Sequence, residues 1–432
     1  MRGSLWTQSV SSERPSTRPA HTAMRSEKMM SSIEHRFALL QTDNAPGQEV
    51  RLAGAAASGS MRGGPLPGRR VDFSHGDIDA FLPAPGAFDR FSEAVAAGGS
   101  RAYTEYRGSA DIRAGLAECL AAFTGAPVSA DHGLILTPGT QGALFLAAGA
   151  LINPGDEVAI VQPDYFANRK IVRFLGGEVL PVRLDYLGAS REAGLDLAGL
   201  RLAFEKGARV FLFSNPNNPT GAIYSAREIG EIAELAEAFG VTIVADQLYS
   251  RLVYDGEVFT HIRASGLPEE RVVTITGPSK TESLSGYRLG VAFGAAAIID
   301  RMEKLQAIVS LRAAGYNQAV LRSWFHEPTG WLEERVRRHQ AIRDDLLGVL
   351  RDGGLPTRSP QGGSYLFPQL PPLAVGLYDF VRLLRLQANV IVTPGTEFGP
   401  HANDIRLNFS QDHAAAVAAG QRIVKMVEYL RR

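Results

Sequence analysis

The sequence is short of cysteine, of long apolar runs and of net charge. Cys119 is the only cysteine in 432 residues, which excludes an internal disulfide and a cysteine-rich metal site. No stretch reaches the roughly 18 consecutive apolar residues that a membrane-spanning helix needs. The 45 lysines and arginines balance 45 aspartates and glutamates, so no overall field attracts nucleic acid or an anionic membrane. These absences predict a cytoplasmic protein whose partner is a small metabolite.

Common catalytic motifs are missing as well. The chain has no GxxxxGK[ST] phosphate loop, no GxSxG nucleophile turn and no HExxH zinc helix. Its nine histidines show no metal-ligand spacing, so we expect no metal site.

Residues 1–45 differ in composition from the rest of the chain. They are rich in Ser, Arg and Thr and poor in aliphatic side chains, which predicts a disordered N-terminal tail. The composition loosely resembles a transit peptide. Met24, Met29 and Met30 indicate an over-extended start at least as well, and we favour a plain tail.

The remaining chain has the pattern of an α/β protein with two domains, for which its length is sufficient. Short Val/Ile/Leu runs alternate with amphipathic helices such as 225–240, which predicts a mostly parallel seven-stranded sheet flanked by helices. We expect residues 95–325 to form this large domain, with 46–94 and 326–432 in a smaller α+β domain. Long helical stretches are predicted at 295–325 and 328–353. The candidate strands are 133–138, 157–163, 178–184, 209–216, 241–246, 271–277 and 289–294.

Three of these strands end in polar or reactive groups, in "SNPNNPTG" (214–221), "ADQLYS" (245–250) and "GPSK" (277–280). Ligands bind beyond the carboxyl ends of such strands, so we expect these side chains to converge. A desolvated Lys280 amine can form an imine with an aldehyde, and the Arg288 fork suits a phosphate. An aldehyde and a phosphate together describe pyridoxal 5'-phosphate.

With these residues the sequence resembles the fold-type I pyridoxal-phosphate enzymes, in particular the class I/II aminotransferases, over about residues 70–430. The resemblance rests on an ordered series of motifs rather than on any single one. The series is Tyr103, "GTQGAL" (139–144), "PDY" (163–165), "NPNNPTG" (215–221), "DQLY" (246–249), "SK" at 280, "YRLG" (287–290) and "RLNFS" (406–410).

The resemblance implies catalytic roles for residues at the strand ends. Lys280 would hold the cofactor as an internal aldimine and move the proton between the substrate Cα and the cofactor. Asp246 would pair with the pyridine nitrogen. Asn218 and Tyr249 would hydrogen-bond the cofactor's phenolic oxygen, although Tyr249 could instead be a packing aromatic.

The resemblance also implies how the cofactor's phosphate and ring are bound. Arg288 would clamp the phosphate, helped by Ser279 and by Thr140 and Gln141 at a helix N-terminus, which favours an anion. Tyr165 would stack on the ring.

Two further contacts concern the substrate and a second subunit. Arg406 would bind the substrate α-carboxylate, with Asn218 beside it. Gly76 would let the backbone approach that carboxylate, or it is an ordinary turn glycine. Tyr103, or alternatively Tyr106, would reach the phosphate of a neighbouring subunit, which implies a homodimer with shared sites.

The chain departs from the family pattern at three positions. Gly277 stands where a phosphate-binding serine is common, and Gln247 stands where the residue is often acidic. Gln141 replaces a lysine that some aspartate-specific relatives carry, so specificity for dicarboxylates does not follow from the resemblance.

The activity that the resemblance implies is ping-pong transfer of an amino group from an α-amino acid to a 2-oxo acid. A β-eliminating lyase or a cyclopropane-forming synthase of the same fold would use the same cofactor contacts. A pyridoxal-phosphate-binding regulator is disfavoured, because no basic helix-turn-helix pattern precedes the resemblance.

Overall fold

The computed structural model describes residues 33–40, 63–76, 80–188 and 192–432. Most of the expected N-terminal tail lies outside these ranges. Within it, residues 33–38 are helical, and the Phe37 ring packs edge-on against Phe174 with a centroid distance of 5.8 Å. None of the described helices is long and apolar enough to cross a bilayer.

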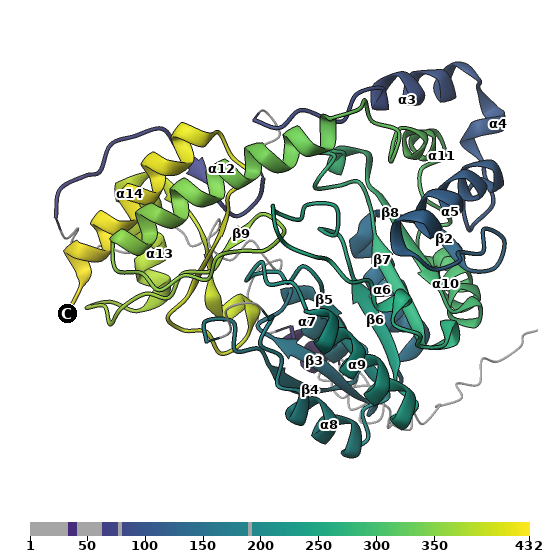
Figure 1. Ribbon diagram of the computed structural model, residues 1–432, viewed down its shortest axis with the longest axis horizontal. Coiled ribbons are helices and arrows are strands. Elements are labelled where there is room, and N and C mark those ends of the chain that lie inside the picture. Colours follow the sequence, from purple (N-terminus) through teal and green to yellow (C-terminus); the bar gives the residue numbers. More distant parts are fainter. Residues whose placement is uncertain (1–32, 41–62, 77–79, 189–191) are drawn as a thin grey trace, which may run out of the picture.

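A seven-stranded sheet in the order β2-β8-β7-β6-β5-β3-β4 forms the centre of the molecule (Figure 1). Every strand runs parallel to the others except β8, which is antiparallel to both β2 and β7. The predicted α/β class with a mostly parallel sheet is therefore confirmed. The strands are β2 (Leu134–Pro138), β3 (Glu157–Gln162), β4 (Glu178–Arg183), β5 (Val210–Ser214), β6 (Thr242–Asp246), β7 (Val272–Thr276) and β8 (Leu289–Gly294).

Helices cover both faces of this sheet, which explains the near-continuous apolar strands. In β3, Ala159 and Val161 pack in one core with α8 and α9, whereas Val158 and Ile160 pack in another with α6, α7 and α10. A third core lies under α5, against β2 and β8. The helices are α5 (Ala110–Thr124), α6 (Gly139–Leu151), α7 (Phe166–Phe174), α8 (Leu197–Glu205), α9 (Ala226–Phe239) and α10 (Ala296–Val309).

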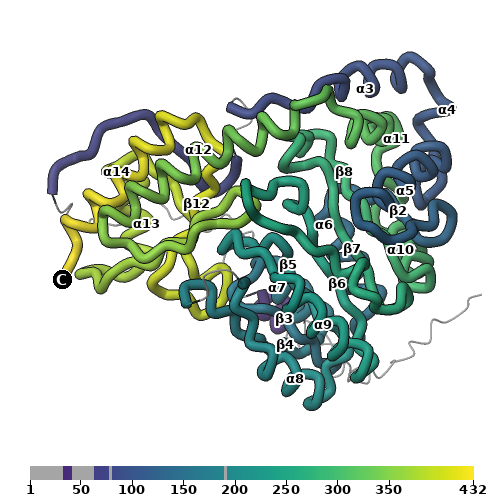
Figure 2. The backbone as a smooth tube through the Cα atoms, viewed as in Figure 1, coloured from purple at the N-terminus to yellow at the C-terminus, as the bar shows by residue number. Residues whose placement is uncertain are grey.

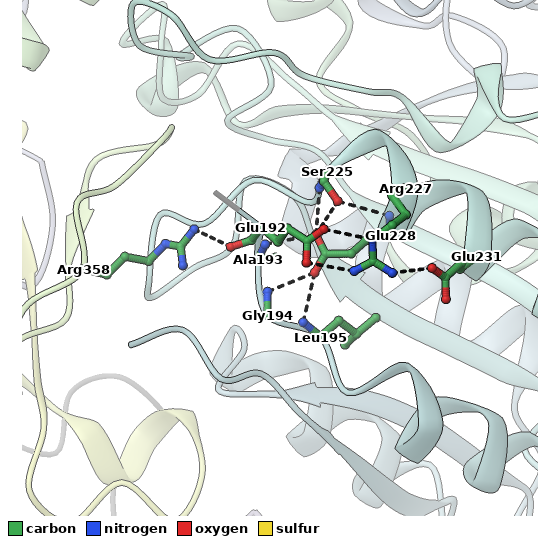
Figure 3. A network of polar contacts seen from close by, with 9 residues as sticks. All are labelled: Glu192, Ala193, Gly194, Leu195, Ser225, Arg227, Glu228, Glu231 and Arg358. Atoms are coloured by element: carbon green, nitrogen blue, oxygen red, sulfur yellow. Dashed lines mark hydrogen bonds and ion pairs between the residues drawn. The ribbon is translucent and has the colours of Figure 1, made fainter. Parts of the chain in front are cut away.

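The buried Glu228 carboxylate fixes the start of α9 (Figure 3). Ser225 and Glu228 form a capping box, in which each side chain accepts a hydrogen bond from the other residue's backbone N–H. The same carboxylate accepts three more backbone N–H groups, from Ala193, Gly194 and Leu195, at 2.9–3.1 Å. The Glu228 side chain therefore accepts backbone N–H groups both from the start of α9 and from residues 193–195.

The helical stretch predicted for 295–325 is wrong beyond Val309. Helix α10 ends there, Leu311 takes a left-handed φ of 62°, and the chain continues as two short turns, α11 (Gly315–Gln318) and η4 (Ala319–Arg322). Tertiary contacts stabilise the break, since Arg312 donates to the Thr104 carbonyl at 2.6 Å and its guanidinium lies 4.9 Å from the Tyr103 ring centroid. No glycine or proline marks this position in the sequence.

A second group of elements packs beside the central sheet, around α12, α13 and α14 (Figure 1). Two small sheets belong to it: β1 pairs in parallel with β10, and β12 lies between β11 and β9. In Figure 2 the purple chain that begins at residue 63 runs alongside α14. The elements are β1 (Val71–Asp72), β9 (Tyr365–Leu366), β10 (Val390–Ile391), β11 (Thr393–Pro394), β12 (Ile405–Asn408), α12 (Trp331–Asp352), α13 (Leu377–Ala388) and α14 (His413–Leu430).

We propose that this group is the smaller domain, formed from residues 46–94 and 326–432 around the large domain of 95–325. One apolar core supports the proposal, because it gathers side chains between Val71 and Phe81 with others between Ile342 and Leu430. The proposed boundary at 94 fits less well. Ala84 and Ala87, the latter in α3 (Ala87–Ala96), pack in the core under α5 instead.

Candidate active site

Ten of the twelve predicted site residues line one cavity of about 220 Å³ at the carboxyl edge of the large sheet. Parallel strands end at the same edge, and the antiparallel β8 begins there, so residues far apart in sequence meet at this edge. The ten are Thr140, Gln141, Tyr165, Asn218, Asp246, Tyr249, Ser279, Lys280, Arg288 and Arg406.

Lys280 lies in the connection between β7 and β8, half-buried. The loop is closed locally, because the Ser283 N–H donates to the Lys280 carbonyl at 3.1 Å and the Leu284 N–H donates to the Pro278 carbonyl at 3.1 Å. The Ser279 hydroxyl donates to the Leu289 carbonyl at 3.3 Å. The amine is thus presented from a turn that is tied to the first residue of β8.

Asp246 is the last residue of β6 and is buried. Its Oδ1 accepts the Leu248 N–H at 3.2 Å. Burial raises the pKa of this carboxyl to about 6, against the opposing effects of that hydrogen bond and of the nearby Lys280 charge. A buried carboxylate of this kind favours a cationic partner in the cavity.

Arg288 and the start of α6 form the cationic end of the cavity. The Arg288 guanidinium lies against Gly139, where an added Cβ would be 2.7 Å from its Nη2. Gly139 has a φ of 76°, and the helix N-cap, Pro138, offers no side-chain cap to the first-turn N–H groups. Donors of the first turn and a guanidinium therefore share one small volume, which suits a phosphate.

Arg406 extends from β12 of the second group of elements into the same cavity. It donates to Asn218 Oδ1 at 3.2 Å and to the Ser74 carbonyl at 2.9 Å. Its guanidinium also lies 4.5 Å from the Tyr365 ring centroid and 4.9 Å from that of Phe398. Its Nε, although buried, has no hydrogen-bond partner among the described residues. The Arg406 guanidinium therefore still has an N–H group that could donate to a bound anion.

Tyr365, in β9, lines the cavity but was not predicted from the sequence. Its hydroxyl lies 2.5 Å from the Tyr249 hydroxyl, and the two rings meet edge-on. Burial and the neighbouring Tyr365 raise the pKa of Tyr249 above its ordinary range, so that phenol remains protonated. Tyr365 lies in the run "SYLFPQL" (364–370), and nothing in that run marks the tyrosine as a site residue.

Tyr165 and Gln141 form one wall of the cavity. The Tyr165 hydroxyl donates to Gln141 Oε1 at 3.0 Å, and both residues line the inner cavity. This hydrogen bond gives Gln141 a role within the protein, as a partner of Tyr165.

Gly76 lies outside this inner cavity and lines a second, outer cavity of about 530 Å³. Lys280 and Tyr249 line both cavities, so the two spaces adjoin at the amine. An added Cβ at Gly76 would lie 3.4 Å from the Ser410 Cβ, which is ordinary contact. Sterics at this position therefore do not require glycine.

Tyr103 lies outside both cavities, 80% exposed, with Arg312 over its ring. The alternative, Tyr106, is also exposed and contacts the same guanidinium. Neither tyrosine contributes to the site of its own chain.

Two departures from the family pattern have physical reasons in the structure. At Gly277 an added Cβ would be 3.1 Å from Thr140 Cγ2 and 3.2 Å from the Leu289 carbonyl, so a serine would crowd the start of α6. Gln247 is buried with its Oε1 2.9 Å from His261 Nδ1. Burial lowers the pKa of His261 to about 4, and a neutral amide suits that neutral imidazole.

Residues 70–421 match the family model described as aminotransferase class I and II. The chain belongs to this family. Among solved structures, it resembles an aspartate aminotransferase from Rhodobacter sphaeroides 2.4.1, with 64% identity, a TM-score of 0.87, and coverage of 93% of this chain and 100% of that one.

Curated aminotransferases also match this chain, at lower sequence identity than the Rhodobacter sphaeroides structure. Putative aminotransferase YugH of Bacillus subtilis is 32% identical over 70% of this chain and 77% of its own length. An aspartate aminotransferase of Sulfolobus acidocaldarius is 27% identical over 78% of this chain and 84% of its own length.

Class I/II aminotransferases use pyridoxal 5'-phosphate, and the residues of the inner cavity fit that group. The cavity offers an amine for the aldehyde, a buried carboxyl for the ring nitrogen and, for the phosphate, a guanidinium beside first-turn helix N–H groups that the N-cap side chain does not cap. Asp246 lines the cavity as a buried carboxyl at a strand end, where a protonated pyridine would compensate for the burial of its charge.

Without the cofactor, Asp246 should reduce stability at neutral pH. Its pKa is higher in the folded protein than in the unfolded chain, so its contribution to stability is present below about pH 4 and is lost as the pH rises through about 6. We expect cofactor-free Asp246→Asn to have a free energy of unfolding about 3 kcal/mol above wild type at pH 8, measured by urea denaturation.

The difference should disappear near pH 4, where the native carboxyl is neutral. Saturating pyridoxal phosphate should reverse the order at pH 8, since only the wild-type ion pairs with the ring. Equal stabilities of the two cofactor-free proteins at pH 8 would contradict this interpretation.

Proposed function

We propose that this aminotransferase transfers the amino group of aspartate to a 2-oxo acid at the inner cavity, with Lys280, Asp246, Arg288 and Arg406 in the roles given below. The observation that carries the proposal is the meeting of all four side chains in one small cavity, from three strand ends and the second group of elements. The aspartate aminotransferase with 64% identity supports the choice of substrate.

Bound pyridoxal phosphate supplies an aldehyde for the amino group and a protonated ring that accepts the electron pair left when the Cα proton departs. Lys280 holds the aldehyde before substrate binds and afterwards carries the proton from the substrate Cα as a general base. Asp246 keeps the ring nitrogen protonated by accepting its hydrogen bond. Burial strengthens that contact, because little water competes for the carboxylate.

The phosphate is bound by Arg288, by the first-turn N–H groups of α6 and by Thr140 and Ser279. Tyr165 packs against the ring, and its bond to Gln141 fixes its orientation. Asn218 and Tyr249 donate to the phenolic oxygen. Asn218 accepts from Arg406 through Oδ1 and therefore has its amide nitrogen available as a donor.

Arg406 binds the α-carboxylate that every α-amino acid substrate carries. Its contacts with Asn218, Tyr365 and Phe398 hold the guanidinium in one orientation, which lowers the entropic cost of substrate binding. The adjoining outer cavity, beside Gly76, leaves room for the substrate side chain.

We also propose that the enzyme is a cytoplasmic homodimer in which Tyr103 reaches the phosphate of the partner site. The single half-buried cysteine supports a reducing compartment. The exposed apolar side chains of Tyr103, Ile308 (81% exposed) and Leu311 support a subunit interface that includes these three residues.

Replacing Lys280 should abolish turnover and leave the fold intact. We expect Lys280→Ala to lower kcat by about 10⁴-fold or more, because both the covalent anchor and the general base are lost. Borohydride reduction of the cofactor-saturated wild type should attach the cofactor to Lys280, as peptide mass spectrometry would show. Near-normal turnover of the variant, or an adduct at another lysine, would refute the assignment.

Replacing Arg406 should weaken binding of all amino acids alike. We expect Arg406→Ala to raise KM by about 100-fold, since a charge-assisted bidentate contact is lost. Stopped-flow absorbance with aspartate, phenylalanine and arginine measures this, and wild type should react fastest with aspartate. A loss confined to one substrate would contradict the role of Arg406, and a faster reaction with another amino acid would overturn aspartate as the substrate.

Charge at the proposed interface should separate the subunits. We expect Ile308→Asp to sediment as a monomer where wild type sediments at twice the 46.5 kDa chain mass, because burying an unpaired carboxylate is costly. Leu202→Asp, on the outer face of α8, is the matched control and should remain dimeric. A monomeric wild type would rule out the proposed dimer.

A further inference from the structure

Asp164 is a buried carboxylate outside the roles proposed so far. It follows β3, directly before Tyr165, and is 3% exposed. It is absent from the described lining of the inner and outer cavities. Its hydrogen-bond donors are neutral: the Ser214 hydroxyl, the Ser214 N–H at 2.9 Å and the Tyr165 N–H at 2.5 Å.

Ser214 connects this carboxylate to the other loops of the site. It is the last residue of β5, in register with Asp246 on β6. While its hydroxyl donates to Asp164, the same oxygen accepts the Asn218 N–H at 3.1 Å. The next residue, Asn215, donates its N–H to the Asp246 carbonyl at 2.9 Å.

The Asp164 carboxylate therefore ties the segment after β3 to the end of β5, and the Asn215 N–H joins the segment after β5 to Asp246 at the end of β6. These segments carry Tyr165, Asn218 and Asp246, the three residues that would contact the cofactor ring. Burying an acid against neutral donors is costly. Burial raises the pKa of Asp164 to about 7, despite its hydrogen bonds to Ser214 and Tyr165. Such a cost is typical of groups kept for a functional site.

We propose that Asp164 is a positioning residue, which acts through Ser214 to hold Tyr165 and Asn218 in place for the cofactor. The proposal rests on the proposed function of the inner cavity. In the native protein Asp164 Oδ1 accepts both the Tyr165 N–H and the Ser214 hydroxyl, and Asp164 Oδ2 accepts the Ser214 N–H. Without them, the ring-stacking residue and the phenolic-oxygen donor are no longer held by a common group.

Cofactor affinity and the visible absorption of the bound cofactor test this role. Asp164→Ala should weaken pyridoxal phosphate binding by about 10- to 100-fold, the range for residues that orient a bound group without touching it. Its visible absorption maximum should also shift. Asp164→Asn retains an acceptor oxygen for the Tyr165 N–H and the Ser214 hydroxyl but loses the acceptor for the Ser214 N–H, so it should recover part of the affinity.

Glu228→Ala is the matched control, because Glu228 is a buried carboxylate that also accepts backbone N–H groups, away from the cavity. Both alanine variants should unfold at lower urea concentrations. Only Asp164→Ala should change the cofactor dissociation constant and the absorption maximum. Equal cofactor affinity in wild type, Asp164→Ala and Glu228→Ala would overturn the proposal.

Ser214→Ala, which removes only the hydroxyl, keeps the proposal testable if Asp164→Ala fails to fold. It should weaken cofactor binding by about tenfold or more, and the loss in the double variant should be smaller than the product of the two single losses, because the two residues share one hydrogen bond. If the loss of cofactor affinity in the double variant equals the product of the two single losses, Asp164 and Ser214 act independently and the proposal is contradicted. A wild type without a Lys280 adduct refutes the proposed function itself, whereas an intact adduct with unchanged variants refutes only the role of Asp164.

Discussion

The site depends on a buried charge at the carboxyl edge of the sheet. Asp246 ends β6, which lies between β5 and β7 in the sheet, and its buried carboxyl accepts one backbone hydrogen bond there. Burial raises its pKa to about 6, so the folded chain holds an acid that a cation would stabilise. In the proposed function, the protonated pyridine ring of the family's cofactor is that cation, and its binding would offset the cost of burying the carboxylate.

The remaining contacts follow from where the strands end. Lys280 and Arg288 flank the turn between β7 and β8, so one short segment presents both the amine and the guanidinium to the cavity. Gly139 allows the guanidinium to lie directly against the start of α6. Close approach of backbone and side chain at this point explains why glycine is required and why Gly277 has no side chain.

The second group of elements completes the site from the other side. Arg406 reaches the inner cavity from β12, and Tyr365 reaches it from β9, where its hydroxyl meets that of Tyr249. The inner cavity is thus lined by side chains from both parts of the chain. Any motion between these parts would change the distance from Arg406 to Lys280.

The sequence by itself determined the sheet and most of the site. Apolar runs bounded by Gly, Pro and Asn predicted all seven strands, and polar residues at strand ends predicted Lys280 and Asp246, because local chemistry is visible in local sequence. Tertiary structure alone decided the break after Val309, the pairing of Tyr365 with Tyr249 and the bond from Asp164 to Ser214. Each of these depends on a partner distant in sequence, and no spacing rule encodes such a contact.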